Sequence, residues 1–343
     1  MELLRPISLT FLLSTLVITN VVADCTCEPE QISGDKGKAL HYKLIAIASI
    51  LTAGGVGVTL PFLGKIFPAL GPEKDGFFVV KTFAAGVILA TGFIHILPQA
   101  FNRLNSPCLE GHGWTEFPMA GLVAMVATMA TLLFESSAAA YQVRAAATKV
   151  MGGGEDTEME VGIMHDHGHG HGHGSLLMDD DAEVRRYRIV SQVLELGIVI
   201  HSVIIGLSLG ASKSPKTIKP LIAALSFHQL FEGLGLGGNI FQAKIKSCAT
   251  VVMGVCFALT TPSGIVVGIL VSNTYDANSS KALIVQGVLD AAAAGILIYM
   301  ALVDLLSPDF KNPRMQNNKF LLLASNISLI LGAGLMSLLA KWV

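Results

Sequence analysis

The chain has 343 residues, of which 52% are hydrophobic and 14% are charged. Ordinary soluble domains carry about a quarter charged residues, so this composition excludes a soluble protein and indicates that most of the chain lies in a lipid bilayer. The formal net charge of −2 also excludes a nucleic-acid-binding protein, because such proteins present a strongly basic surface.

Residues 1–23 have the pattern of a secretory signal peptide. Arg5 precedes an apolar stretch over residues 7–22, and small residues follow at the expected cleavage site. The alternative is an anchor helix that is not cleaved. Cleavage would leave residues 24–40 as an extracytosolic segment, in a compartment where thiols can oxidise. Three cysteines would share that compartment and could form a disulfide, although the sequence does not fix their pairing: Cys25, Cys27 and Cys108.

Eight stretches after the leader are long and apolar enough to cross a bilayer. A spanning helix needs about twenty mostly apolar residues, and lipid does not tolerate the unpaired backbone groups of an open strand. The expected spans are residues 41–68, 77–101, 117–140, 189–211, 218–241, 247–272, 281–306 and 319–341. We therefore predict an all-α integral membrane protein with three transmembrane helices in residues 41–140 and five in residues 189–343.

The loop between the third and fourth spans, residues 141–188, has a composition of its own. Lysines and arginines are more frequent on its side of the spans, and the positive-inside rule then places the loop in the cytosol and both termini outside. Glycines, acidic residues and histidines predominate in it, so we expect disorder. Histidines at every second position offer imidazole nitrogens to metal ions, and the alternative is a hydrophilic spacer. These residues are His165, His167, His169, His171 and His173.

Ionisable side chains inside the spans are costly and usually functional. Residues 201–210 and 228–237 share His, Gly, Leu, Leu and Gly at the same spacing. Because consecutive spans run in opposite directions, these segments would face each other like the halves of an inverted repeat. His228 and Glu232 lie four residues apart on one helix face, and His201 lies on the other helix. The pattern predicts a metal site between the fourth and fifth helices, against the alternative of histidines that only bond between helices.

The second span carries another polar pair. His95 and Gln99 are four residues apart, near the expected outer end of the helix, and Pro98 would loosen the helix between them. We consider two interpretations, an entrance site for a cation and a histidine that only satisfies a helix interface. The sequence does not separate them.

These motifs resemble those of the ZIP family of zinc and iron transporters, most closely its plant branch. Residues 201–210 look like the family signature of the fourth helix, and residues 228–233 look like that of the fifth. The eight spans, the outer termini, the leader and the histidine-rich loop also agree, so the resemblance covers nearly the whole chain.

The resemblance implies two adjacent metal positions between the fourth and fifth helices. The main position matches His201, His228 and Glu232, and a neighbouring second position matches Ser202 and Gln229. The chain departs from the family at two places. Some members carry a carboxylate where this chain has Ile205, and the family often has Asp where this chain has Gln99.

We therefore expect transport of zinc, or of iron(II), manganese or another divalent metal, into the cytosol by alternating access. The ion would be the substrate, and no catalytic cofactor is expected. The alternatives are a metal-sensing membrane receptor and a cation-diffusion-type exporter, which would have six spans and cytosolic termini. The His-Glu-x-x-His motif of a metalloprotease does not occur, so we do not expect an enzyme. A plasma-membrane location and a homodimer are further hypotheses.

Overall fold

The computed structural model describes residues 36–65, 74–109, 117–152, 174–243, 247–272 and 279–342. Within these ranges the chain forms helices and no strands. The expected signal peptide and the five alternating histidines lie outside the described residues.

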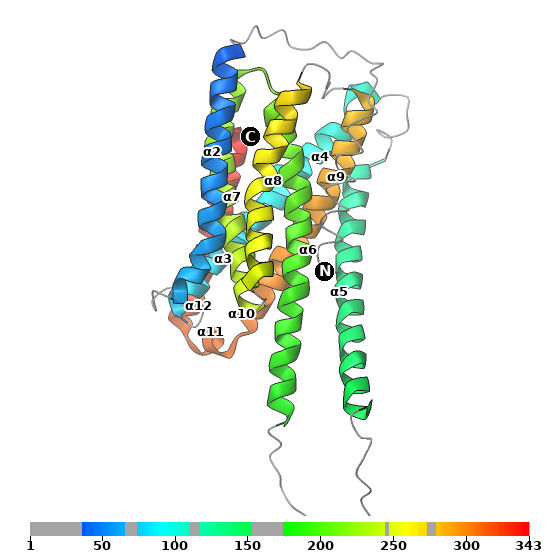
Figure 1. The fold of residues 1–343 in the computed structure, drawn as a ribbon, viewed down its shortest axis with the longest axis vertical. Coiled ribbons are helices and arrows are strands. Elements are labelled where there is room, and N and C mark those ends of the chain that lie inside the picture. The colour runs from blue at the N-terminus through cyan, green and yellow to red at the C-terminus, as the bar shows by residue number, and fades with distance from the viewer. Residues whose placement is uncertain are drawn as a thin grey trace, which may run out of the picture.

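The long helices lie side by side along the long axis of the molecule (Figure 1). Two of them are continued through short π-helical stretches, η5 and η7, so that α3–η5–α4 and α9–η7–α10 each run as one rod. The elements are α2 (Lys36–Thr59), η3 (Leu60–Lys65), α3 (Asp75–Ala90), η5 (Thr91–Ile96), α4 (Leu97–Leu104), η6 (Pro107–Leu109), α5 (Met119–Gly152), α6 (Gly174–Ala211), α7 (Pro215–Gln242), α8 (Ser247–Val271), α9 (Ser280–Tyr299), η7 (Met300–Leu306), α10 (Ser307–Lys311), α11 (Pro313–Asn317), α12 (Lys319–Leu339) and η8 (Ala340–Trp342).

Seven helical segments among the described residues are long and apolar enough to cross a membrane. They are Gly37–Leu63, Asp75–Leu104, Met119–Ala138, Arg188–Ala211, Cys248–Val271, Ser280–Lys311 and Lys319–Leu339. Seven of the eight expected spans therefore meet this criterion. The other expected span, residues 218–241, lies in α7, which has 28 residues but is less apolar because His228, Gln229 and Glu232 interrupt it.

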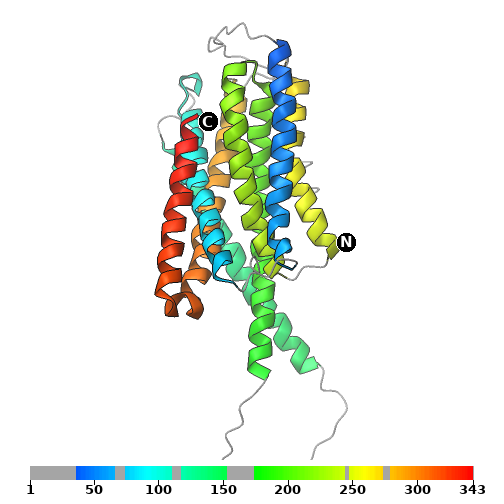
Figure 2. The ribbon, with the colours of Figure 1, turned by 90° about the vertical axis from the view of Figure 1, so that its left-hand side faces the viewer.

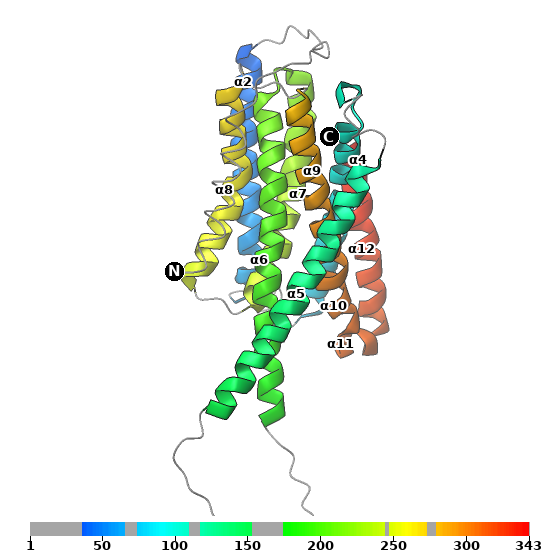
Figure 3. The same cartoon turned by 90° about the vertical axis from the view of Figure 1, so that its right-hand side faces the viewer.

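The helices form two groups that meet along the middle of the molecule. In the first group α2 packs most extensively on α7, and α6 packs on α8. In the second group α3 packs on α12, and α9 packs on α4 and α5. Figures 2 and 3 show α12 and α8 at opposite edges of the bundle, with α5 crossing obliquely over one side. The groups contact each other mainly through α6 with α9 and α3 with α7.

Glycines allow the closest helix pairs of the first group to form. A Cβ atom on Gly57 of α2 would lie 2.2 Å from the carbonyl oxygen of Leu230 in α7. A Cβ atom on Gly210 of α6 would lie 2.2 Å from the carbonyl oxygen of Ile265 in α8. No side chain fits at such distances, so these helices pack backbone to backbone, as small residues permit in lipid.

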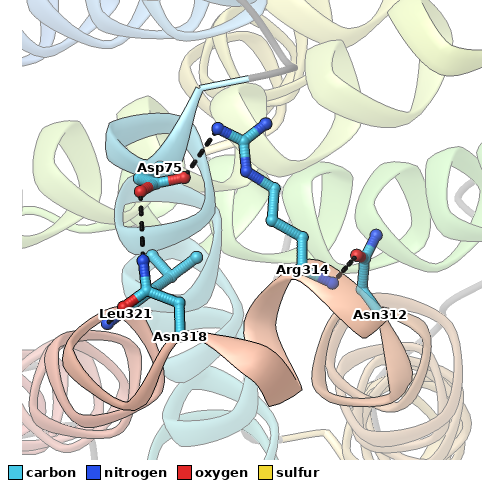
Figure 4. A network of polar contacts seen from close by, with 5 residues as sticks. All are labelled: Asp75, Asn312, Arg314, Asn318 and Leu321. Carbon is cyan, nitrogen blue, oxygen red and sulfur yellow. Dashed lines mark hydrogen bonds and ion pairs between the residues drawn. The ribbon is translucent and has the colours of Figure 1, made fainter.

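Polar contacts tie the beginning of α3 to the connection between α10 and α12. Asp75 forms an ion pair of 2.8 Å with Arg314 and accepts a hydrogen bond of 3.4 Å from the amide of Asn318 (Figure 4). Six residues further along α3, Lys81 donates to Asp309 at 2.8 Å, and both side chains are buried. These contacts hold α3, α10 and α12 together at one end.

The prediction of disorder over residues 141–188 is wrong at both ends of that range. Residues 141–152 continue α5, and residues 174–188 form the first turns of α6. The two helices consequently protrude beyond the rest of the bundle (Figure 1). The reason is local: residues 141–152 contain three alanines, residues 174–188 contain two leucines and three arginines, and these residue types have high helix propensity. Only residues 153–173 of the expected loop lie outside the described residues.

The expected oxidation of Cys108 is confirmed, since this residue is disulfide-bonded. The other two candidate cysteines lie outside the described residues. Cys248 and Cys256 of α8 are free thiols.

Candidate functional site

Three buried histidines from three helices converge at the boundary between the two helix groups. His95 comes from η5, His201 from α6 and His228 from α7. The ring centroid of His95 lies 5.6 Å from that of His201 and 5.9 Å from that of His228. The centroids of His201 and His228 are 5.9 Å apart. Each residue is at most 2% exposed. We call these three residues the histidine cluster.

The π-helical stretch η5 sets the position of His95. Pro98 follows it and has no backbone N–H, so the carbonyl of Ile94 lacks its usual α-helical donor. A wide π turn accommodates this gap and rotates the residues of the turn relative to a regular helix, a feature often found at functional sites. The structure thus places the ring of His95 against the rings of His201 and His228. Gln99 lies in α4, one turn beyond the cluster, and is only partly buried.

Glu232 supplies a carboxylate beside the cluster. It lies one turn after His228 on α7 and is fully buried. Ser202 and Gln229, the sequence candidates for a second metal position, are each 1% exposed and adjoin His201 and His228 along the chain.

Many polar atoms of this site have no hydrogen-bond partner in the described part of the chain. They include both carboxylate oxygens of Glu232, both ring nitrogens of His201, Nδ1 of His228, Nε2 of His95, Oγ of Ser202 and Nε2 of Gln229. A buried polar atom left without a partner costs about 1–3 kcal/mol, so a purely structural core would not concentrate so many of them. These unpartnered nitrogen and oxygen atoms suit a ligand that binds both elements.

A divalent metal ion is such a ligand. Zinc binds imidazole nitrogen and carboxylate oxygen, and two imidazoles that share one tetrahedral zinc at about 2.0 Å have ring centroids roughly 5 Å apart. The observed separations are slightly wider. Among the described residues, no three His, Cys, Asp or Glu side chains are close enough in this conformation to hold an ion. The histidine rings would therefore need to approach one another by roughly an ångström or less to share one.

The structure adds a residue that the sequence did not single out. Thr261 of α8 is 1% exposed, and its hydroxyl donates a hydrogen bond of 3.2 Å to Oε1 of Gln229. Gly54 of α2 also packs against this side chain, since a Cβ atom there would be 3.2 Å from Cγ of Gln229. Helix α8 thus orients a site residue. Hydroxyl groups are common in spanning helices, so the sequence carried no signal for Thr261.

The expected spans contain four other carboxylates besides Glu232, and at least two of them have partners outside the histidine cluster. Glu135 of α5 accepts a hydrogen bond of 3.0 Å from the Tyr299 hydroxyl, and Asp290 of α9 forms an ion pair with Arg103 of α4. Glu195 of α6 and Asp304 of η7 are buried, at 4% and 1% exposure.

The fold and the site together define a multi-spanning helical membrane protein with a buried imidazole and carboxylate site. A sequence model described as the ZIP zinc transporter family matches residues 40–340. The chain belongs to this family.

Named plant transporters are similar to it over nearly their whole length. Zinc transporter 5 of Oryza sativa subsp. japonica is 52% identical over 325 residues, with 93% of this chain and 92% of the relative covered. Zinc transporter 3 of Arabidopsis thaliana is 51% identical over 320 residues, covering 93% and 89%. Fe(2+) transport protein 1 of Oryza sativa subsp. japonica is 48% identical over 335 residues, covering 93% and 90%.

Proposed function

We propose that this chain transports zinc across a membrane toward the cytosol, with the ion as substrate. The observation that carries the proposal is the histidine cluster, three buried imidazoles from three helices with the unpartnered carboxylate of Glu232 beside them. Relatives that are named as zinc transporters support zinc as the substrate. A relative named as an Fe(2+) transport protein supports iron(II) as a further one, and nitrogen and oxygen ligands accept manganese as well.

In this proposal α7 is an eighth spanning helix. Its polar side chains lower its apolar content, but they are buried against α2, α3, α6 and α8 and not directed at lipid. Polar residues in a spanning helix are tolerated where they face the bundle interior. Eight spans would put both termini on the same side of the membrane, and the distribution of lysines and arginines favours the extracytosolic side for them and the cytosol for the loop between α5 and α6.

The division of the cluster between helix groups supports alternating access. His95 belongs to the α3–η5–α4 rod of the second group, whereas His201 and His228 belong to the first group. Movement of one group against the other would change the distance from His95 to the other two rings. An ion captured near His95 and Gln99 would pass to His201, His228 and Glu232 and leave toward the cytosol.

Ser202 and Gln229 would form the neighbouring second metal position. Neutral oxygen ligands bind a divalent ion less strongly than a carboxylate does, and Ile205 adds no ligand, so this position would hold metal weakly. The five alternating histidines of the cytosolic loop would bind metal that emerges from the site. The plasma-membrane location and the homodimer remain predictions.

The test is uptake of radioactive zinc into yeast cells that lack their own zinc uptake systems. The parent chain should produce saturable uptake, and His228→Ala should lose most of it at equal surface expression. His41→Ala is the matched control, because His41 is an exposed histidine of α2 away from the site. Equal uptake by the parent and His228→Ala would reject the proposed site, and no uptake by the parent would reject the proposed function.

A further inference from the structure

An ion pair lies on the expected outer approach to the histidine cluster. Arg103 and Asp290 join α4 to α9, with side-chain exposures of 19% and 1%. Arg103 follows His95 by eight residues on the same rod, which corresponds to roughly 12 Å of helical rise. Gln99 lies between them, so the three residues follow one another at intervals of four along one side of the helix.

The packing of α4 on α9 fixes where the guanidinium group starts. A Cβ atom on Gly287 would lie 2.6 Å from Cγ of Leu104 and 3.3 Å from Cβ of Arg103. The two helices are therefore in close contact one turn from Asp290, which keeps the backbone of Arg103 beside α9.

The charges of this pair have opposite effects on an arriving cation. Without Arg103, the buried carboxylate of Asp290 would be an oxygen ligand for a divalent ion. In the structure the guanidinium group of Arg103 forms an ion pair with that carboxylate. The positive charge of Arg103 also repels a metal ion that approaches the cluster. From the sequence alone, Asp290 could be a residue of the transport path or a charge at a helix end, and Arg103 was not singled out.

We propose that the Arg103–Asp290 ion pair controls the charge of the outer approach and thereby limits how strongly divalent cations are captured. This inference rests on the proposed function. Arg103 acts as a competitor for the Asp290 carboxylate, and Asp290 in turn neutralises a charge that would otherwise oppose zinc. The pair should also disfavour cations that prefer oxygen ligands, such as manganese, because it withholds a carboxylate from them.

The test is the concentration dependence of initial zinc and manganese uptake by the full chain in cells, at low ionic strength. We expect Arg103→Gln to lower the KM for zinc by about three- to tenfold, and Asp290→Asn to raise it by a similar factor. The double variant should return to within about twofold of the parent, because the two charge effects cancel. Arg103→Gln should also increase manganese uptake relative to zinc. Lys281→Gln is the control, since it removes a positive charge from the exposed start of α9.

A purely structural ion pair would behave differently. Both single variants would then lower surface expression and the melting temperature, without opposite changes in KM, and this result would overturn the inference while parental uptake persists. Equal changes of KM in Arg103→Gln and Lys281→Gln would also overturn it, because the effect would then come from overall surface charge. A parent chain that carries no zinc would instead overturn the proposed function, and this inference with it.

Discussion

The imidazole rings of His95 and His201 lie edge to face, with their centroids 5.6 Å apart and their planes at 87°. The two residues belong to different helix groups, so this contact spans the boundary along which those groups meet. His228 completes the cluster from α7. His95, for which the sequence left an entrance site and an interface histidine open, is therefore as close to the other two histidines as they are to each other.

This contact predicts a large effect of His95 on zinc transport. His95→Ala removes a nitrogen donor from the cluster, and loss of a group at a metal site reduces affinity or activity by about tenfold or more. Gln99→Ala should change the KM by less than about threefold, since Gln99 lies outside the cluster. Kinetics of zinc uptake would compare the two variants at equal expression. A larger effect for Gln99→Ala than for His95→Ala would contradict this prediction.

Uptake should decrease as the pH falls from 7 to 5. An imidazole binds metal only when it is neutral, and a carboxylate binds it best when it is ionised. Protons therefore compete with zinc at every ligand of the site, and the loss at low pH should be partly reversed by more zinc. Uptake measured across this range at fixed free zinc would check the prediction. A flat profile would argue against histidine and glutamate ligands.

Thr261 should affect zinc binding through Gln229. Thr261→Val removes the hydroxyl donor and leaves Oε1 of Gln229 buried without it, at a cost of about 1–3 kcal/mol. We expect a lower melting temperature and a smaller zinc-induced rise in it, whereas Thr261→Ser should resemble the parent. Thr260→Val is the control, because the Thr260 hydroxyl donates within its own helix, to the carbonyl of Phe257. Identical zinc responses in the two valine variants would show that Thr261 has no special role.

The Lys81–Asp309 ion pair should matter more for stability than the Asp75–Arg314 pair. Both side chains of the first pair are at most 7% exposed, so Lys81→Met would leave a buried carboxylate without its partner, at a cost of about 3–5 kcal/mol. Lys81→Met combined with Asp309→Leu should recover most of that loss. Arg314→Gln should cost at most about 1 kcal/mol, because its pair is about half exposed. Unfolding of the purified variants would measure these differences, and equal losses for Lys81→Met and Arg314→Gln would contradict the ranking.

Deletion of residues 165–173 should alter metal selectivity or regulation more than basal transport. The deleted imidazoles lie on the expected cytosolic loop, outside the described residues and separate in sequence from the cluster. Zinc uptake at low and high external zinc would compare the deletion with the parent. Complete loss of flux would contradict this division of roles.

The sequence was sufficient for the parts of the fold that local composition determines. Apolar stretches located seven of the eight expected spans, and the repeated frame around His201 and His228 identified the two helices that bring these histidines together. The ends of α5 and α6 were misassigned, because polar and acidic residues suggested a loop where helix propensity continues the helix.

The remaining features depend on contacts between distant segments. The position of His95 follows from the π turn before Pro98, which the proline signals in the sequence, and from packing between helix groups, which has no marker in one sequence. The bond from Thr261 to Gln229 and the pair of Arg103 with Asp290 likewise join helices that are far apart along the chain. Such partners can be identified only once the relative positions of the helices in the bundle are known.

Zinc-edge anomalous diffraction from crystals of the full chain soaked with one equivalent of zinc tests the account most directly. We expect an anomalous peak within bonding distance of His201, His228 and Glu232, with the histidine rings drawn closer than their present 5.6–5.9 Å separations. Zinc bound elsewhere in the chain, with the cluster unchanged and unoccupied at saturating metal, would contradict the account.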